Sequence, residues 1–332
     1  MRKSKRRPAT VWLDYGPAAS DKLLRNISAA VAAGPSLWTA SDEGRTIECL
    51  EPHGDGFRLR EQVSLDGLFA ALPGKARGDE ADIESLAVEA GRLWVCGSHC
   101  HVRRKAKEAD RIDTRFRDRA SRCLLGAVEL KKDGGDTARK GTALPFRGAG
   151  SLRAILRKNA YIAPFIDLPS KENGLDIEGL AVSGERLLLG LRGPLVDSIA
   201  IAVEFETARQ GLIKRGKPVT HLLELGGLGI RDLTVMNREI AILAGPVSAA
   251  NVPFKLFRWR PRRTDKIQRP DLLWEWPLGR EHPEGICPLE RHGKPGLLVV
   301  YDAPAEARIR GRRYRADWVA LSPSERRRAR KR

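Results

Sequence analysis

Short apolar runs separated by turn residues recur along the chain, and the clearest example lies between residues 176 and 194, DIEGLAVSGERLLLGLRGP. Two runs, Ile177–Val182 and Leu187–Leu191, flank a polar turn that contains Gly184. Each run is too short for a stable helix, and glycine supplies the positive φ that a tight turn requires. The pattern therefore predicts a β-hairpin.

The same hairpin pattern recurs at residues 26–43, 82–99, 229–246 and 282–302. The matching points of the copies hold, in chain order, Ser28, Glu84, Glu178, Asp232 and Glu284. Consecutive points lie 56, 94, 54 and 52 residues apart. Hairpins repeated every 40–55 residues are typical of propeller blades. We expect an all-β fold, a single β-propeller of five blades. The 94-residue interval holds an insertion or, in the alternative, a sixth blade.

Composition divides the chain into a basic N-terminal arm (residues 1–9), a propeller domain (10–307) and a basic C-terminal tail (308–332). The apolar triplet at 11–13 predicts a strand that closes the ring against the last blade. Residues 101–122 are densely charged, and their spacing suits i,i+4 ion pairs, so we expect a charged helical insertion there.

The two tails carry most of the formal net charge of +18. Basic tails can make non-specific contacts with polyanions, and the alternative is a solvated tail with no partner. No sequence motif of specific nucleic-acid binding is present. The N-terminus lacks the apolar stretch of a signal peptide, and no apolar run reaches the 18 residues of a membrane span. With five cysteines in no disulfide pattern, these features predict a cytoplasmic protein.

Acidic side chains at the matching points suggest a site on the propeller axis, where innermost strands meet. The candidate metal ligands are Glu84, Glu178, Asp232 and Glu284. Carboxylates gathered at one mouth repel one another unless a cation such as Ca²⁺, or the arginines Arg192 and Arg231, compensates them. The alternative is that each carboxylate joins neighbouring strands through structural hydrogen bonds.

The hairpin exits differ between copies, as side chains of a specialised site would. They include Asp42, His99 and Arg192. His99 is a candidate general base, with an ordinary hydrogen-bonded loop histidine as the alternative. Arg192, together with Arg231, is a candidate clamp for a phosphate or carboxylate. Cys96, His99, Cys100 and His101 lie close together, but no second Cys/His pair completes a zinc site.

Five segments of the sequence resemble a bacterial family of the domain of unknown function 3616. They are DIESLAV with GSH at 82–99, DIEGLAV with LGLRGP at 176–194, GIRDL at 229–233, AGP at 244–246 and HPEGI at 282–286. The resemblance implies a β-propeller-like fold and no established activity. A more distant similarity to calcium-dependent phytase-like and esterase-like propellers implies that Glu84, Glu178 and Glu284 face a metal ion.

The leading functional expectation is a propeller whose carboxylate-lined axial site binds a divalent cation or a small anionic molecule. Its catalytic version is metal-dependent hydrolysis of a phosphoester or ester, with an ion-activated water and Arg192 on the anionic group. The alternative is a non-catalytic interaction scaffold whose basic tails bind polyanions.

Overall fold

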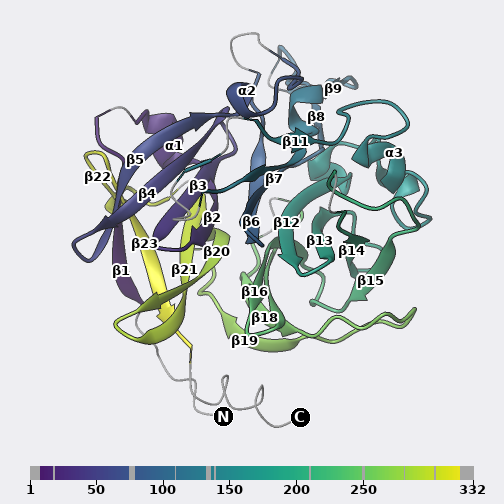
Figure 1. The fold of residues 1–332 in the computed structure, drawn as a ribbon. Coiled ribbons are helices and arrows are strands. Elements are labelled where there is room, and N and C mark those ends of the chain that lie inside the picture. The colour runs from purple at the N-terminus through teal and green to yellow at the C-terminus, as the bar shows by residue number, and fades with distance from the viewer. Residues whose placement is uncertain are drawn as a thin grey trace.

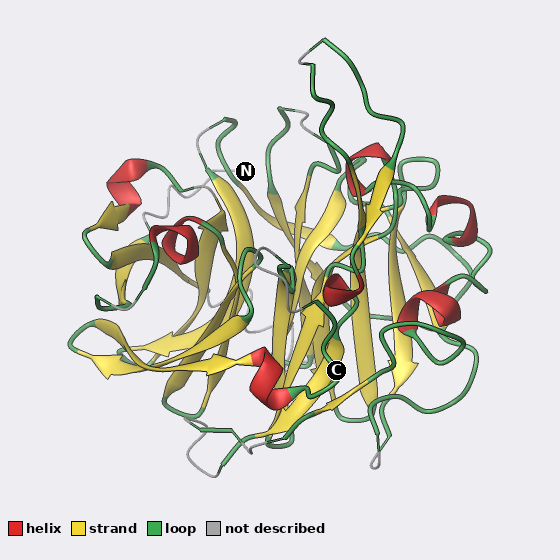
Figure 2. Ribbon diagram, turned by 90° about the horizontal axis from the view of Figure 1, so that it is seen from above, coloured by secondary structure: helices red, strands yellow, loops and turns green. Residues whose placement is uncertain are grey.

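The computed structural model describes most of the chain. The described residues are 8–17, 19–74, 79–108, 110–131, 136–137, 140–208, 211–248, 251–279, 281–302 and 304–321. Strands are the predominant regular elements, and the helices are short segments (Figure 2). They are α1 (Asp21–Arg25), α2 (Leu65–Leu68), α3 (Leu152–Leu156), η1 (Ala120–Arg122), η2 (Ala163–Phe165), η3 (Ser170–Glu172) and η4 (Glu306–Arg308). None of the helices in these ranges has the length and apolarity needed to cross a membrane.

Antiparallel sheets account for nearly all the strands. One sheet contains β6 (Ile83–Glu89), β7 (Arg92–Gly97), β10 (Leu125–Glu129) and β11 (Thr142–Ala143). A second contains β12 (Asp176–Ser183), β13 (Arg186–Gly193), β14 (Ala200–Glu206) and β15 (Val219–Leu223). A third contains β16 (Gly229–Met236), β17 (Glu239–Gly245), β18 (Lys255–Trp259) and β19 (Asp271–Glu275).

The largest sheet joins the two ends of the chain. It contains β2 (Ile27–Ala33), β3 (Ser36–Ser41), β4 (Thr46–His53), β5 (Gly56–Ser64), β1 (Ala9–Asp14), β20 (His282–Arg291), β21 (Lys294–Asp302), β22 (Ile309–Arg310) and β23 (Arg313–Ala320). Strand β1 pairs antiparallel with β23 and parallel with β5. The N-terminal strand predicted from residues 11–13 therefore exists and lies beside the end of the chain.

The first strands of the hairpin copies form a closed ring. Strand β2 contacts β6, β6 contacts β12, β12 contacts β16, β16 contacts β20, and β20 contacts β2 again. These strands lie around the middle of the molecule in Figure 1. Each is followed outward by its hairpin partner, so the fold is all-β and propeller-like.

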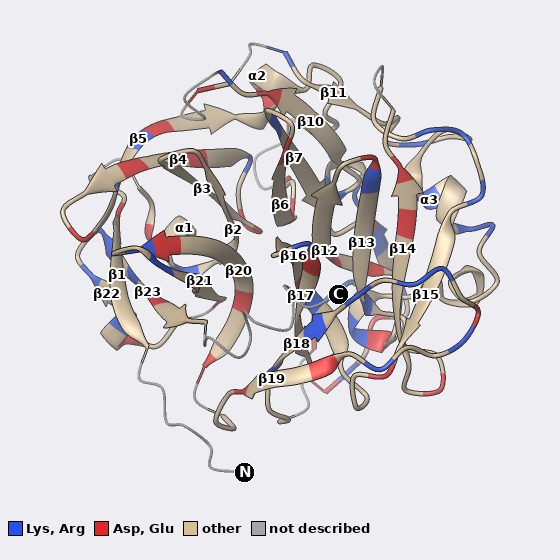
Figure 3. Cartoon of the chain, turned by 60° about the horizontal axis from the view of Figure 1, so that its bottom comes forward, with Lys and Arg blue, Asp and Glu red and all other residues tan. Residues whose placement is uncertain are grey.

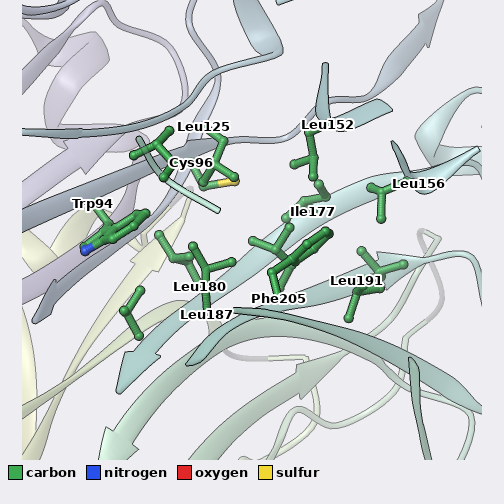
Figure 4. Close-up of a cluster of buried hydrophobic side chains, with 14 of the residues drawn as sticks. Trp94, Cys96, Leu125, Leu152, Leu156, Ile177, Leu180, Leu187, Leu191 and Phe205 are labelled. Atoms are coloured by element: carbon green, nitrogen blue, oxygen red, sulfur yellow. The ribbon is translucent and has the colours of Figure 1, made fainter. Parts of the chain in front are cut away.

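Apolar side chains fill the space between neighbouring sheets. In one cluster Trp94 on β7 and Leu125 on β10 pack together with Ile177 on β12 and Leu187 on β13 (Figure 4). Burying such surface contributes roughly 25 cal/mol per Å² and is the main force that holds adjacent sheets together. The ring of inner strands is thus fixed by packing on both faces of each sheet.

The C-terminal boundary of the propeller lies later than predicted. Residues 308–321 do not form a tail, because β23 pairs with both β21 and β1. Within β23 the side chains of Tyr314 and Ala316 are buried, and Arg313 and Arg315 alternate with them. Alternation of this kind is the pattern of a half-buried strand, which the arginine content of the segment obscured. The polyanion contacts predicted for the tails fall largely on residues 1–7 and 322–332, outside the described residues.

The charged helical insertion predicted at 101–122 is wrong. Its described residues form β8 (His101–Arg103), β9 (Phe116–Asp118) and η1, with β8 and β9 paired antiparallel. Charged residues spaced for i,i+4 pairs stabilise a helix only weakly, and this segment has no apolar face to bury. The ribbon is instead held by its neighbours: Arg103 donates to Glu172 and to the carbonyl of Asp113.

Candidate functional site

Every strand of the inner ring contains a β-bulge at the same place. The register shifts that mark the bulges leave out Ser28 in β2, Glu84 in β6, Glu178 in β12, Arg231 in β16 and Glu284 in β20. A bulge gives one residue no partner in the ladder and redirects its side chain. Arg231, rather than Asp232, is therefore the structural equivalent of the glutamates.

Arg231 lies between two of these glutamates and pairs with both. Its Nε donates to Glu284 Oε2 at 2.8 Å, and its Nη1 donates to Glu178 Oε1 at 3.2 Å. Glu178 Oε2 lies 2.9 Å from the same Nε but accepts no hydrogen bond, because that N–H points to Glu284. The three side chains are all buried, so a protein cation occupies this side of the axis.

Arg192 extends the same network. Its Nη2 donates to Asp176 Oδ2 at 2.5 Å, and its Nη1 lies 2.8 Å from Glu178 Oε1. In Figure 3 acidic positions on β12 and β20 lie around the centre of the ring. Of the predicted candidates, the structure therefore brings together Glu178, Glu284, Arg192 and Arg231.

Asp232 has a different place. Its carboxylate accepts hydrogen bonds from Ser85 Oγ at 3.0 Å, from the Ile286 N–H at 2.8 Å and from the Leu233 N–H at 2.7 Å. It thereby links β6, β16 and β20 below the bulges, and it is not among the side chains that line the axial pocket. Burial raises the pKa of Asp232 well above its usual value. Asp232 therefore joins neighbouring strands through structural hydrogen bonds, which is the alternative expected for the carboxylates.

A pocket of about 770 Å³ opens above the bulges. Its inner part is lined by the carboxylates Asp42, Asp82, Glu84, Asp176, Glu178, Glu284 and Asp302 and by the guanidinium groups of Arg122, Arg192 and Arg231. Carboxylates therefore outnumber arginines on this floor. Because both Arg192 and Arg231 are already paired, the floor offers mainly hydrogen-bond acceptors.

Glu84 is the bulged glutamate that makes no ion pair with an arginine, although the charges of Arg192 and Arg231 act on it at longer range. Its carboxylate makes no hydrogen bond or ion pair with any part of the chain that the structure describes. Burial and the neighbouring Glu178 charge raise the pKa of Glu84 well above its usual value. Burial and the charges of Asp82 and Asp302 raise the pKa of Asp42 to about 8. One oxygen of Asp42 and one of Asp176 are also buried without a hydrogen-bond donor.

The wall beside Glu84 contains residues that the repeat pattern did not reveal. Arg122 Nη1 donates to Asp82 Oδ2 at 2.8 Å and to Cys100 Sγ at 3.2 Å. Burial raises the pKa of the Cys100 thiol well above its usual value, so the group stays a thiol at neutral pH. Arg122 follows the ribbon and belongs to no hairpin copy, which is why no repeat signal pointed to it.

His99 lies outside the pocket lining. It is buried, its backbone has a φ of 55°, and its Nε2 lies 3.2 Å from the carbonyl oxygen of Leu124. Burial and the charge of Arg153 lower the pKa of His99 to about 3. The imidazole is therefore neutral, and the structure does not bring it into contact with the pocket carboxylates.

Metal-ligand geometry is missing from the described part of the chain. No group of three or more His, Cys, Asp or Glu side chains there is arranged to hold a metal ion. The carboxylates of Glu178 and Glu284 are separated by the guanidinium of Arg231, which takes the place that a cation between them would occupy.

The family model described as "Protein of unknown function (DUF3616)" matches residues 26–316. The chain belongs to this family. No curated protein sequence matches it.

Three solved structures that resemble this chain do so at low identity. A glutaminyl cyclase from Myxococcus xanthus is 11% identical, with 96% of this chain and 99% of that chain covered and a TM-score of 0.44. A xylan beta-1,4-xylosidase from Bacillus halodurans C-125 is 11% identical, with coverages of 92% and 55% and a TM-score of 0.49. A PQQ-bound aldose sugar dehydrogenase from Streptomyces coelicolor is 9% identical, with coverages of 95% and 100% and a TM-score of 0.38. Similarity at this level assigns none of these activities to this chain.

Proposed function

We propose that this DUF3616 protein is a five-bladed propeller that binds a small organic molecule in its axial pocket through ammonium or hydroxyl groups of that molecule. The closed contact ring of β2, β6, β12, β16 and β20 supports five blades. The observation that carries the ligand class is the Glu84 carboxylate, which faces the pocket without a hydrogen bond or ion pair to the described residues.

The charge of the floor favours a donor over an acceptor as ligand. The predicted anion clamp requires free guanidinium groups, but Arg192 is committed to Asp176 and Glu178, and Arg231 to Glu178 and Glu284. An anion at this depth would meet carboxyl groups rather than free cationic groups. An ammonium or hydroxyl group would instead satisfy the free oxygens of Asp42 and Asp176 as well as Glu84.

The size of the pocket favours an organic molecule over a bare ion. Pockets of roughly 300–1,000 Å³ are typical of small-molecule sites, and this one has about 770 Å³. An ion needs several converging ligands at close range, whereas a larger molecule can use carboxylates that stand apart.

Glu84 also has the properties of a proton donor. A carboxyl group whose pKa is raised by burial keeps its proton to a higher pH than a free glutamic acid does and can pass it to a bound molecule. When an ammonium group binds beside it, the carboxylate form is favoured and the proton is released. Binding should therefore be linked to proton release, which an enthalpy that varies with the buffer would reveal.

A second candidate is a divalent cation that activates water for hydrolysis of a phosphoester or ester. The mutual repulsion of Glu84, Glu178, Asp82 and Asp42 favours it, because a bound cation would relieve that repulsion. Such a cation would have to draw the carboxylates together, since those of the described residues are not so arranged.

The test is a panel of diamines, amino sugars, polyols and simple anions, with Ca²⁺ and Mg²⁺ as separate additions. Binding is detected by thermal shift and then measured by calorimetry in two buffers of different ionisation enthalpy. The wild type is compared with Glu84→Gln and with Glu61→Gln, a matched change at an exposed position on β5.

We expect saturable binding of amines or polyols that releases protons, is lost in Glu84→Gln and is retained in Glu61→Gln. Binding of Ca²⁺ or Mg²⁺ alone, lost in Glu84→Gln, would replace this proposal with the metal-dependent one. Binding of anions alone, or no compound whose binding depends on Glu84, would overturn it.

A further inference from the structure

The outer part of the same pocket has the opposite charge from its floor. The ribbon of β8 and β9 lies at the upper edge of the molecule in Figure 1, and the segment after β8 together with η3 lines the pocket entrance. This rim contributes the cations Arg103, Arg104, Lys105, Arg111 and Lys171 and the carboxylates Glu108, Asp113 and Glu172, so cations are in excess there. The pocket therefore runs from an acidic floor to a basic rim.

Some of the rim cations are engaged with the protein. Arg103 Nη2 donates to Glu172 Oε2 at 2.6 Å, and Arg111 Nε lies 2.6 Å from Glu108 Oε2. These pairs neutralise part of the rim. The Arg103–Glu172 pair also joins the ribbon to η3, two segments far apart in the sequence.

Other rim cations have no such partner. The side chains of Arg104, Lys105 and Lys171 are exposed, and within the described ranges they make no hydrogen bond or ion pair, although the charge of Arg104 acts on the nearby Asp113. Arg104 follows Arg103 directly, and Lys171 precedes Glu172. The bridge between Arg103 and Glu172 therefore holds the backbones of these two free cations together at the entrance.

We propose that the ligand is bipolar, with an oxyanion group held at the rim by Arg104, Lys105 and Lys171 while its ammonium or hydroxyl groups reach the floor. This inference rests on the proposed function, because it assumes that the floor binds donors. The oxyanion is a phosphate or a carboxylate, since both accept charge-assisted hydrogen bonds from guanidinium and ammonium groups. Repulsion by the floor carboxylates fixes the orientation of the molecule and keeps its anionic end at the entrance.

The rim and the floor together favour a molecule that carries both an oxyanion and an ammonium or hydroxyl group. A simple anion gains only the rim contacts and is repelled further in, whereas a simple amine gains only the floor contacts. A molecule with both groups makes both sets of contacts with a single loss of translational and rotational freedom, so its affinity exceeds that of either fragment.

The experiment uses matched pairs of probes that differ only in the oxyanion. Glucosamine is compared with glucosamine 6-phosphate, ethanolamine with phosphoethanolamine, and butylamine with 4-aminobutyrate, with inorganic phosphate as the anion alone. Dissociation constants are measured by calorimetry on the full chain at low and high salt. The variants are Lys105→Gln combined with Lys171→Gln, Glu84→Gln, and Lys107→Gln as the matched control. Lys107 is exposed in the same segment and does not line the pocket.

We expect at least one oxyanion form to bind roughly tenfold or more tightly than its partner in the wild type, with an advantage that shrinks at high salt. The advantage should fall below about threefold in the double lysine variant and persist in Lys107→Gln. The pair that shows it, phosphate or carboxylate, identifies the source of the oxyanion.

Two failures are distinguishable. If amines or amino sugars bind in a Glu84-dependent manner but no oxyanion form binds more tightly, the bipolar ligand is refuted and the proposed function survives. If no probe shows Glu84-dependent binding, the proposed function fails and the present inference fails with it.

Discussion

Arg231 is the side chain on which the axial network depends most, and its replacement by methionine tests the network directly. Methionine keeps much of the apolar length of the side chain and removes the charge. Glu178 and Glu284 would then remain buried, with Glu284 losing the hydrogen bonds it receives from Arg231. Glu178 would still pair with Arg192. The negative charge of Glu284 would therefore lose more of its compensation than that of Glu178.

The expected loss is large because one partner of a buried pair is removed. Such changes cost about 3–5 kcal/mol, mostly from the charge left without compensation. Unfolding entropy is about 2 cal/mol/K per residue, which for 332 residues makes each kcal/mol worth roughly 1.4 °C in Tm. The midpoint should therefore fall by about 4–7 °C at pH 8.

The pH dependence of the free energy of unfolding distinguishes the loss of the Arg231 charge from a loss of packing. Without Arg231 the folded-state pKa values of Glu178 and Glu284, already raised by burial, rise further above their unfolded values. A carboxyl group with a raised folded pKa favours the folded state at low pH, and that contribution is lost as pH rises through the folded pKa. The variant should thus lose less free energy of unfolding at pH 5 than at pH 8.

Urea unfolding at both pH values measures this difference. Arg58→Met, which breaks an exposed ion pair with Glu51, is the matched control and should cost less than about 1 kcal/mol. A loss in Arg231→Met below about 1 kcal/mol at pH 8, or an equal loss at both pH values, would refute the view that its charge holds the buried glutamates.

Three further predictions concern the scaffold. Gly285→Ala places a Cβ 2.7 Å from a methyl group of Val300 and 2.9 Å from the carbonyl oxygen of Ser28, so it should cost about 1–3 kcal/mol in urea unfolding; an unchanged midpoint would contradict this crowding. Leu13→Asp places a charge in the buried strand β1, which pairs with both β23 and β5. It should lower Tm by several degrees, and an unchanged Tm in thermal unfolding followed by circular dichroism would contradict this. Because the folded pKa of Asp42 is about 8, the wild type should lose free energy of unfolding as pH rises from about 4 to 8. Asp42→Asn should reduce that slope, because the other buried carboxyl groups with raised pKa values still contribute to it; parallel slopes in the two proteins would count against the raised pKa of Asp42.

The repeat pattern is enough to locate the inner strands and the bulged glutamates of the axial pocket. Glu84, Glu178 and Glu284 occupy equivalent bulges, as the matching of the copies predicted. In the copy at residues 229–246, matching by charge aligns Asp232 with the glutamates, which is one residue later than the bulged Arg231. An isoleucine precedes the bulge in four copies, at positions 27, 83, 177 and 230, and matching on it would have selected Arg231.

Features set by distant pairing were harder to predict. Strand β23 depends on β1, about 300 residues earlier, and no local pattern in an arginine-rich segment reveals that partner. Arg122 reaches Asp82 from beyond the ribbon, outside the repeat. The prediction for His99 rests on its residue type and its place at a hairpin exit, and neither reveals that its ring lies against the backbone carbonyl of Leu124. Residue chemistry predicted which groups could act, and backbone register decided which of them meet.

The bulge position explains how one repeated hairpin yields an asymmetric site, and Ser28 provides the test. Its hydroxyl donates to the carbonyl oxygens of Ile83 at 2.5 Å and Ala40 at 3.3 Å, so this copy contributes a small, neutral group beside Glu84. Ser28→Glu would turn a carboxylate toward those carbonyls, with no arginine on that side, and should cost about 3–5 kcal/mol in urea unfolding at pH 8. The reciprocal Glu84→Ser removes a carboxylate that has no ion pair in the described chain and should leave stability unchanged or increased. Equal losses in the two variants would show that the bulged side chains are interchangeable spacers, whereas the expected asymmetry would show that the open, acidic side of the pocket depends on a small residue at position 28.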